Sequence, residues 1–256
     1  MRRSGLERAT TTVGGGAGEE AEARRGFIGV PGLDELLPAG LTYDTQIMVT
    51  GETGVGKSVL AGQFLYEGLL VGDACVYVAC DEAPNTMRFN MANLRLGTVA
   101  YERAGRLVLI DAFGGERSTE AVVVPDPRNL DEYFSYEREV IERFRGASVR
   151  LVVDSLSTIF GTVDRNTVLE FNRDRLRYLS AHRVLALDNY VTGLLDEQTM
   201  AGLGHSYPLI VQLGYRITDG ELRQRYFQLG KMRSGMFSGE RRTFRIDPHA
   251  GIVTQR

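Results

Sequence analysis

Three glycines, a lysine and a serine lie close together in the segment GETGVGKS at residues 51–58. The spacing Gly-x-x-x-x-Gly-Lys-Ser is the P-loop pattern, and each residue type has a chemical reason. Glycines allow a tight turn whose backbone N–H groups point inward, where they donate to phosphate oxygens beside a helix N-terminus. We therefore predict a nucleotide-phosphate site formed by Gly51, Glu52, Thr53, Gly54, Val55, Gly56, Lys57 and Ser58.

The last two residues of this motif have separate expected roles. Lys57 would reach the β- and γ-phosphates, and the Ser58 hydroxyl would bind Mg²⁺. Such a site also needs an acidic residue at the end of another strand, which holds the metal directly or through a water. Two apolar runs end in an aspartate, RLVVD at Asp154 and LVLID at Asp111. Position alone leaves both as candidates, and Asp111 also fits a simple cap of its own strand end.

An adjacent pair of acids, Asp81 and Glu82, follows a further apolar run, ACVYVAC at residues 74–80. Hydrolysis of a phosphoanhydride needs a carboxylate that accepts a hydrogen bond from the attacking water. Successive residues of a strand face opposite ways, so only one of the two can take this role. An ordinary solvated strand end before Pro84 is the alternative interpretation.

A pair of cations lies near the C-terminus, in the segment KMRSG that begins at Lys231. Lys231 and Arg233 are two residues apart, so on a strand both would project from one face. Two cations on one face suit a triphosphate, and arginine stabilises the charge that develops during phosphoryl transfer. A solvated basic face on a hairpin is the alternative.

The segments around these residues alternate between strand and helix patterns, which predicts an α/β fold with a mostly parallel central sheet flanked by helices. The near-continuous apolar character of the strands suits burial on both faces. The predicted strands are residues 45–50, 74–80, 106–112, 150–156 and 183–191, and the predicted helices are 58–72, 130–146 and 168–182.

The C-terminal part has a different pattern. Residues 209–235 are typical of two strands joined at Asp219-Gly220, which predicts a β-hairpin region. The preceding stretch, residues 192–209, has scattered glycines and apolar residues, and we expect a loop there. His182, His205 and His249 are far apart without ligand-like neighbours, so they do not indicate a metal site.

Composition limits the class of protein. The chain has 256 residues, 43% hydrophobic and 25% charged, with a net charge of −3, which is typical of a soluble globular domain. It contains no apolar run long enough to span a membrane and no apolar secretory signal, so we expect a cytoplasmic protein. Cys75 and Cys80 would point to opposite faces of one strand as reduced core residues. Residues 1–25 have no apolar periodicity and predict a disordered tail.

The ordered set of motifs from residue 29 onward resembles the KaiC domain of the RecA-like ATPases. The matching segments are GVPGLDELLPAGL, GETGVGKS, QFLYEGL, VYVACDEAP, LVVDSLSTIF, KMRSG and FRIDPHAGI. The resemblance implies one RecA-like P-loop NTPase domain over residues 26–256, which binds ATP and Mg²⁺. It also implies a homo-oligomeric ring, with a hexamer expected, that holds nucleotide between neighbouring subunits.

The same resemblance suggests roles for individual residues. It favours Asp154 over Asp111 as the metal-facing acid, and Ser155 as a contact to the γ-phosphate. The family usually carries two glutamates where this chain has Asp81 and Glu82, and the first positions the attacking water. We therefore assign that role to Asp81, which is one methylene shorter than glutamate, with Glu82 as the alternate.

The matching lysine and arginine of the family, at Lys231 and Arg233 here, reach the nucleotide of the adjacent subunit. In RecA-like proteins the region of residues 192–209 lines the central opening, so it is our candidate for contact with a protein partner. The resemblance does not imply a clock function, because the clock protein has two such domains and this chain has one.

Three functions follow from these observations. The first is an ATPase, with slow turnover, that acts as an oligomeric regulatory switch of the KaiC family. The second is an ATP-gated docking module with little turnover, like the ATP-binding protein of the archaellum motor, and Asp81 in place of glutamate favours it slightly. The third, a relative of the DNA recombinases, is disfavoured by the acidic net charge, although basic residues at 223–225 and 240–242 are compatible with binding nucleic acid.

Overall fold

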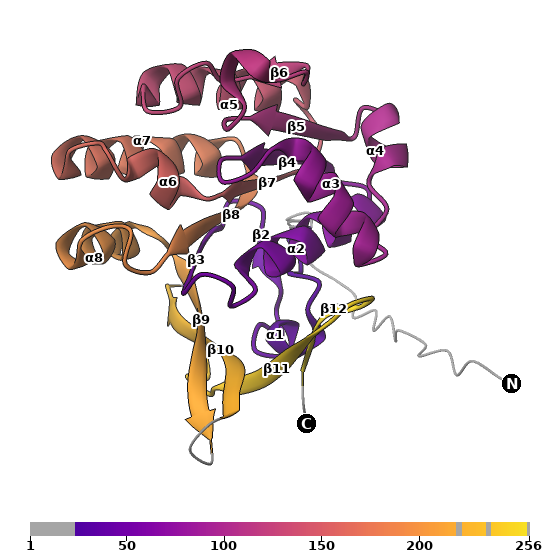
Figure 1. Cartoon of the computed structure of the whole chain (residues 1–256), viewed down its shortest axis with the longest axis vertical. Coiled ribbons are helices and arrows are strands. Elements are labelled where there is room, and N and C mark those ends of the chain that lie inside the picture. Colours follow the sequence, from indigo (N-terminus) through magenta and orange to yellow (C-terminus); the bar gives the residue numbers. More distant parts are fainter. Residues whose placement is uncertain (1–23, 219–221, 234–236, 255–256) are drawn as a thin grey trace, which may run out of the picture.

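The computed structural model of the chain describes residues 24–218, 222–233 and 237–254 (Figure 1). The predicted tail lies almost wholly outside these residues, and so does the predicted turn at Asp219-Gly220. The described chain begins with Arg25–Gly26, which form the short strand β1 and pair with β2 (Leu41–Thr42). This two-stranded sheet lies beside the main one.

Within the described residues, ten strands form one sheet in the order β12-β11-β10-β9-β3-β8-β7-β4-β5-β6. Strands β3 to β9 run parallel to their neighbours, whereas β9 to β12 form an antiparallel extension. The fold is therefore the expected RecA-like α/β sheet with C-terminal antiparallel strands. The strands are β3 (Gln46–Gly51), β4 (Ala74–Ala79), β5 (Leu107–Asp111), β6 (Val122–Val123), β7 (Val149–Asp154), β8 (Val184–Val191), β9 (Leu209–Thr218), β10 (Leu222–Met232), β11 (Arg242–Asp247) and β12 (Gly251–Thr254).

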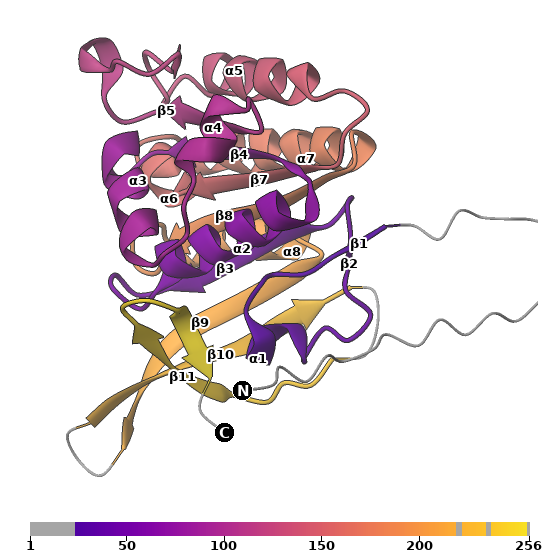
Figure 2. The same cartoon turned by 90° about the vertical axis from the view of Figure 1, so that its right-hand side faces the viewer.

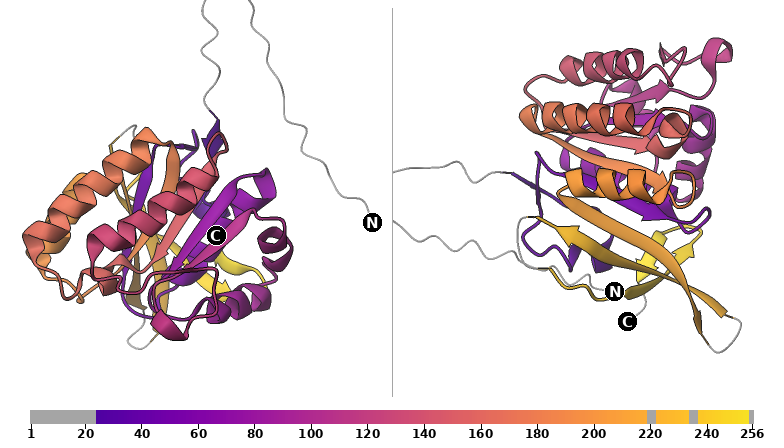
Figure 3. Two further views of the ribbon diagram at one scale, coloured as in Figure 1. Left: turned by 90° about the horizontal axis from the view of Figure 1, so that it is seen from above. Right: turned by 90° about the vertical axis from the view of Figure 1, so that its left-hand side faces the viewer.

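Helices cover both faces of the parallel part, with α2 and α3 on one side and α7 and α8 on the other (Figures 1 and 3). Among the helices of the described residues, none is long and apolar enough to cross a lipid bilayer. The helices are α1 (Pro31–Asp34), α2 (Lys57–Val71), α3 (Pro84–Asn93), α4 (Val99–Arg103), α5 (Leu130–Arg143), α6 (Leu156–Phe160), α7 (Arg165–Ala181) and α8 (Glu197–Ser206).

The predicted elements agree with these bounds to within a few residues. All five predicted strands are present as β3, β4, β5, β7 and β8, and the three predicted helices are α2, α5 and α7. Gly72 ends α2 in a left-handed conformation, as its position suggested. Helix α7 begins three residues before the predicted range, because the Asp164 carboxylate accepts hydrogen bonds from the N–H groups of Asn166 and Thr167.

The prediction of a loop at residues 192–209 is wrong, because α8 occupies most of this stretch. The Asp196 carboxylate caps the helix by accepting from the N–H of Thr199 at 2.9 Å. The two glycines in the helix lower its intrinsic propensity, which explains the prediction. One of them has a packing reason, since a Cβ at Gly202 would lie 2.8 Å from Leu169 of α7. Close packing of α8 on α7 therefore stabilises a helical conformation that the two glycines disfavour.

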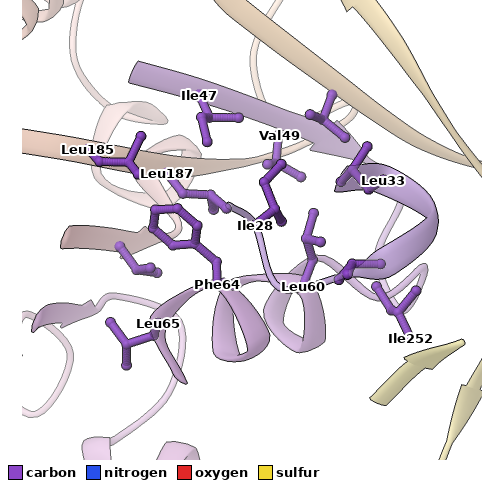
Figure 4. Close-up of a cluster of buried hydrophobic side chains, with 14 of the residues drawn as sticks. Ile28, Leu33, Ile47, Val49, Leu60, Phe64, Leu65, Leu185, Leu187 and Ile252 are labelled. Carbon is purple, nitrogen blue, oxygen red and sulfur yellow. The ribbon is translucent and has the colours of Figure 1, made fainter. Parts of the chain in front are cut away.

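The core lies in two layers, one on each face of the sheet. Figure 4 shows Leu60 and Phe64 of α2 directed toward Ile47 and Val49 of β3 and toward Leu187 of β8. This layer holds α2 in place, and with it the loop that precedes the helix. The cysteines are free and buried, with Cys75 in this layer and Cys80 in the other, as expected for opposite faces of one strand.

An ion cluster is buried under the other face. The Arg175 guanidinium of α7 donates to Glu137 of α5 at 2.9 Å and to Asp188 of β8 at 2.8 Å, and all three side chains are inaccessible to solvent. Burial is the main cause that raises the pKa of Glu137, and the Arg175 charge opposes it. The Tyr207 hydroxyl also donates to Asp188. Arg175 thus ties α5 and α7 to the central strand β8.

We predict that Arg175→Ala lowers the free energy of unfolding by about 3–5 kcal/mol, because it leaves two buried carboxylates without their cation. Chemical denaturation measures this loss. The control is Arg177→Ala on the same helix, whose 70% exposed side chain pairs with Asp174 and should change the stability by less than about 0.5 kcal/mol. Equal losses in the two variants would contradict the importance of the cluster.

Candidate nucleotide-binding site

The loop between β3 and α2 has backbone geometry that requires glycine at both ends. At Gly51 a Cβ would lie 2.7 Å from the carbonyl oxygen of Leu213 in β9. Gly56, the residue before α2, has a φ of 121°, which side chains rarely tolerate, and a Cβ there would lie 3.1 Å from Ile246. The tip of the loop is exposed at residues 52–54. The Tyr215 hydroxyl of β9 supports this tip by donating to the Gly54 carbonyl at 3.0 Å.

Lys57 lies inside the loop. Its Nζ donates to the carbonyl oxygens of Gly51 and Glu52, each at 2.9 Å, and the residue is only 7% exposed. Burial lowers the pKa of Lys57, and the negative charges of Asp154 and Asp81 oppose this change. Ser58 is exposed on the first turn of the same helix. Lys57 lies beyond the carboxyl end of β3, at the same edge of the sheet as Asp154 at the end of β7 and Asp81 just after β4.

Asp154 ends β7 and is held by two neighbouring strands. Tyr77 of β4 donates its hydroxyl to one carboxylate oxygen at 2.9 Å, and the side-chain amide of Asn189 in β8 donates to the other at 2.8 Å. The residue is 6% exposed. A cis peptide links Asp154 to Ser155. Two fixed donors thus set the orientation of this carboxylate before any ligand is bound.

Asp111, the other candidate, has a different environment. Its carboxylate accepts hydrogen bonds from the backbone N–H groups of Phe113 at 2.8 Å and Gly114 at 2.7 Å. It therefore caps the loop that follows β5, which is the alternative that its position allowed. β5 is also two strands farther than β7 from β3, which carries the P-loop.

Asp81 and Glu82 have separate partners, as expected for adjacent residues after a strand. Asp81 accepts hydrogen bonds from the hydroxyls of Ser155, at 3.0 Å, and Thr158. Glu82 instead accepts from the side-chain amide of Asn90 in α3 at 3.2 Å. Burial raises the pKa of Glu82, and the charge of Asp154 raises it further. The two carboxylates therefore serve different parts of the site.

A cavity of about 620 Å³ extends from the start of α2 toward α3. Ser58 and Glu82 line it on the polar side, and Met87, Met91 and Pro248 contribute apolar surface. It is open beside the P-loop and large enough for a small-molecule ligand group. This cavity could not be predicted from local sequence patterns, because its lining residues come from segments far apart in the chain.

The structure separates Lys231 and Arg233 from the P-loop of the same chain. β9 begins opposite Ile47, near the amino end of β3, whereas the P-loop follows the carboxyl end of β3. β10 runs antiparallel to β9 and carries Lys231 back to the amino end. The two cations therefore lie at the opposite end of the sheet from Lys57.

Both cations contact the C-terminal end of α8. Lys231 Nζ donates to the carbonyl oxygens of Gly204 at 2.9 Å and His205 at 2.8 Å, and Arg233 donates to His205 at 3.1 Å. A bulge at Gly230 shifts the register of β10 just before Lys231. Lys231 and Arg233 therefore share one helix end, and their contact with nucleotide stays a prediction.

Local sequence patterns do not predict several residues that contact the acids of the site. Tyr77 and Asn189 lie inside apolar strands, and only the pairing of β4, β7 and β8 brings them to Asp154. Thr158 is part of the segment LVVDSLSTIF, but nothing in its position shows that it reaches Asp81. Within the described residues, no group of three or more His, Cys, Asp or Glu side chains could hold a metal by itself.

Known proteins of similar sequence and fold match most of the chain. A UPF0273 protein of Pyrococcus furiosus is 30% identical over 244 residues, which cover 90% of this chain and 94% of the relative. A UPF0273 protein of Aeropyrum pernix is 33% identical over 234 residues, covering 88% and 91%. The crystal structure of a KaiC-like protein from Pyrococcus horikoshii superposes with a TM-score of 0.73 at 26% identity, covering 91% of this chain and all of that one.

The sequence profile of the KaiC ATPases matches residues 27–256, which is nearly the whole described chain and includes every site residue discussed above. The chain therefore belongs to the KaiC family of ATPases.

Proposed function

We propose that this chain binds ATP with Mg²⁺ and hydrolyses it between the β- and γ-phosphates, as an oligomeric regulatory switch. The observation that carries this proposal is that the P-loop with Lys57, Asp154 and Asp81 all lie at the carboxyl ends of parallel strands of one sheet, β3, β7 and β4. Membership of the KaiC ATPase family supports it.

The phosphates would lie over the N-terminus of α2. The N-cap residue is Gly56, which offers no side chain to cap the first turn. The N–H groups of that turn and the positive end of the helix dipole are therefore available to phosphate oxygens. Lys57 adds a positive charge at the same place, and the cavity beside Ser58 offers apolar surface for the base.

The oxygen groups of Ser58 on α2 and Asp154 at the end of β7 fit the ligand preference of a magnesium ion. Ser58 and Asp154 would hold it, since Mg²⁺ prefers oxygen ligands and is commonly bound by one or two carboxylates together with phosphates. Bound there, the ion would neutralise charge on the β- and γ-phosphates. Tyr77 and Asn189 hold the Asp154 carboxylate in one orientation.

Asp81 is the residue that we propose to position the attacking water. It would accept a hydrogen bond from a water in line with the γ-phosphorus and then take its proton. The water oxygen bonds to phosphorus, the bond to the β–γ bridging oxygen breaks, and ADP and phosphate leave. Glu82 has one described side-chain donor, Asn90, so its carboxylate has a less fixed direction than that of Asp81, and it is the alternate.

Lys231 and Arg233 would act on the nucleotide of an adjacent subunit. They lie at the amino end of the sheet, opposite the P-loop of their own chain. A head-to-tail contact between identical chains brings one end against the other, and such contacts close into rings when the rotation permits. Each site would then combine Lys57 of one subunit with the Lys231 and Arg233 pair of its neighbour.

A second candidate function is an ATP-gated docking module with little turnover. The observation that favours it is the aspartate at position 81, whose carboxylate extends one methylene less than that of glutamate. In that case ATP occupancy would control contact with a protein partner, and residues 192–209, with α8, are the proposed contact region.

The first test is steady-state phosphate release from Mg·ATP by the wild-type protein and by Lys57→Ala. We expect release at least roughly 100-fold slower in the variant, because it loses the cation at the transferred phosphate. Tight ATP binding by the wild type without phosphate release would instead support the docking module. Release at equal rates in both proteins would show a contaminating activity.

The assignment of Asp154 is tested by nucleotide titration with and without Mg²⁺. Asp154→Asn should weaken Mg²⁺-dependent binding by about 10- to 100-fold and leave binding in the presence of a chelator nearly unchanged. The matched control is Asp111→Asn at the end of β5, whose side-chain oxygen can still accept from Phe113 and Gly114. A loss in the control equal to that in Asp154→Asn would contradict the assignment.

The action of Arg233 on a neighbouring subunit is tested by mixing two inactive variants. Arg233→Ala should lower turnover on the order of 10³-fold and leave nucleotide binding by isolated subunits intact. Mixed with Lys57→Ala it should regain activity, since the Lys57→Ala subunit supplies an intact Arg233 to its neighbour's P-loop. Fluorescence transfer between labelled subunits verifies exchange. Exchange without recovery would overturn the proposed role.

A further inference from the structure

Three side-chain hydroxyls gather around Asp81, and we call Ser155, Ser157 and Thr158 the hydroxyl cluster. Ser155 Oγ lies 3.0 Å and 3.3 Å from the two carboxylate oxygens of Asp81, and Thr158 Oγ1 donates to the second of them. Ser155 and Ser157 share a hydrogen bond of 3.0 Å. Both oxygens of the carboxylate are therefore engaged by the segment that follows β7.

Ser155 gives up a common structural role to make this contact. It is the N-cap residue of α6, where a serine usually accepts a hydrogen bond from a backbone N–H of the first turn. Its side chain makes no such bond here. The Ser155 oxygen instead lies 3.0 Å from the Ser157 hydroxyl, and its O–H donates to Asp81 at 3.0 Å.

The hydroxyl cluster is also connected to the P-loop. The Val191 N–H donates to Ser157 Oγ at 3.0 Å, and the next residue, Thr192, donates its N–H to the Gly51 carbonyl at 3.0 Å. The same carbonyl accepts from Lys57 Nζ. An unbroken series of polar contacts and one backbone link therefore runs from Lys57 to the Asp81 carboxylate through the end of β8.

We infer that Ser155 and Thr158 are positioning residues that fix the Asp81 carboxylate for the attacking water, and that Ser157 joins them to the P-loop. This inference rests on the proposed hydrolysis. The side chain of an aspartate is shorter than that of a glutamate. The Asp81 carboxylate can therefore contact the attacking water only in a narrow range of orientations. A carboxylate has about four acceptor sites. Its oxygens can therefore accept the hydroxyls and still accept a water.

Glu82 provides the contrast within the same site. Its described side-chain hydrogen bond is a single one, from Asn90 at 3.2 Å, and it faces the cavity. A longer side chain with one donor has more rotational freedom than Asp81 with its two hydroxyl donors. The hydroxyl cluster thus distinguishes which of the two acids has a defined orientation.

The test compares Thr158→Val, which replaces the hydroxyl by a methyl group of similar size, with Thr158→Ser, which retains it. We expect kcat for Mg·ATP to fall roughly 10- to 100-fold in Thr158→Val, because small displacements of a reacting group cost rates of this order. KM and the affinity for nucleotide should stay unchanged, and Thr158→Ser should restore kcat to nearly the wild-type value. The matched control is Thr162→Val, an exposed threonine just after α6.

A double variant separates positioning from structural damage. In an Asp81→Asn background, Thr158→Val should cause no further loss of kcat, because the hydroxyl acts only through the carboxylate. A full additional loss, an unchanged kcat in Thr158→Val, or failure of Thr158→Ser to restore it would each overturn the positioning role.

Phosphate release by the wild type distinguishes a failure of the proposed hydrolysis from a failure of the positioning role. If wild-type phosphate release does not exceed that of Lys57→Ala, the proposed hydrolysis is wrong, and the positioning role is rejected with it. If the wild type turns over normally and Thr158→Val matches it, only the positioning role is wrong.

Discussion

The alignment of four parallel strands at one edge of the sheet is the constraint on which the site depends. Ala79 of β4 is in register with Asp154 of β7, and Gly51 of β3 is in register with Val191 of β8. Parallel strands end at the same edge, so the segments that follow them meet there. The P-loop, Asp81, Asp154 and Asn189 are all at or just beyond these ends. A shift in register of one residue would separate them and turn their side chains to the other face.

Burial of the strands on both faces explains why the alignment is secure. The strands are apolar along most of their length, and α2 on one side and α7 on the other exclude water from them. Several of the charged groups that remain inside are paired. Arg175 holds α5, α7 and β8 together. Tyr77 of β4 and Asn189 of β8 both donate to Asp154 of β7, which lies between these two strands (Figure 2). The same contacts that satisfy buried charge therefore also orient the acid of the site.

Charge is arranged differently at the two ends of the sheet. At the carboxyl end Lys57 is buried against the carbonyl oxygens of its own loop, and burial lowers its pKa, while the charges of Asp154 and Asp81 oppose this change. A triphosphate would bring negative charge to this lysine, and a divalent cation would compensate the acids. At the amino end two cations, Lys231 and Arg233, meet the carbonyl oxygens at the end of α8. The proposed function places this cationic end of one chain against the P-loop end of another.

The sequence by itself determined the fold class, the five inner strands and the P-loop, because these depend on local patterns. Apolar runs predict buried strands, and Gly51 and Gly56 predict a loop that no other residue could form. Position after such a run named Asp154 beside Asp111 and Asp81 beside Glu82, and the resemblance to the KaiC domain favoured the first of each pair. The partners of these acids were not predictable, because Tyr77, Asn189 and Thr158 belong to segments that lie far from them in the chain.

Helix α8 was not predictable either, because its glycines disfavour a helix locally and only packing against Leu169 of α7 stabilises one. Only the tertiary structure decided which of the two neighbouring acids is held in a fixed direction, because hydrogen-bond donors from distant segments determine it.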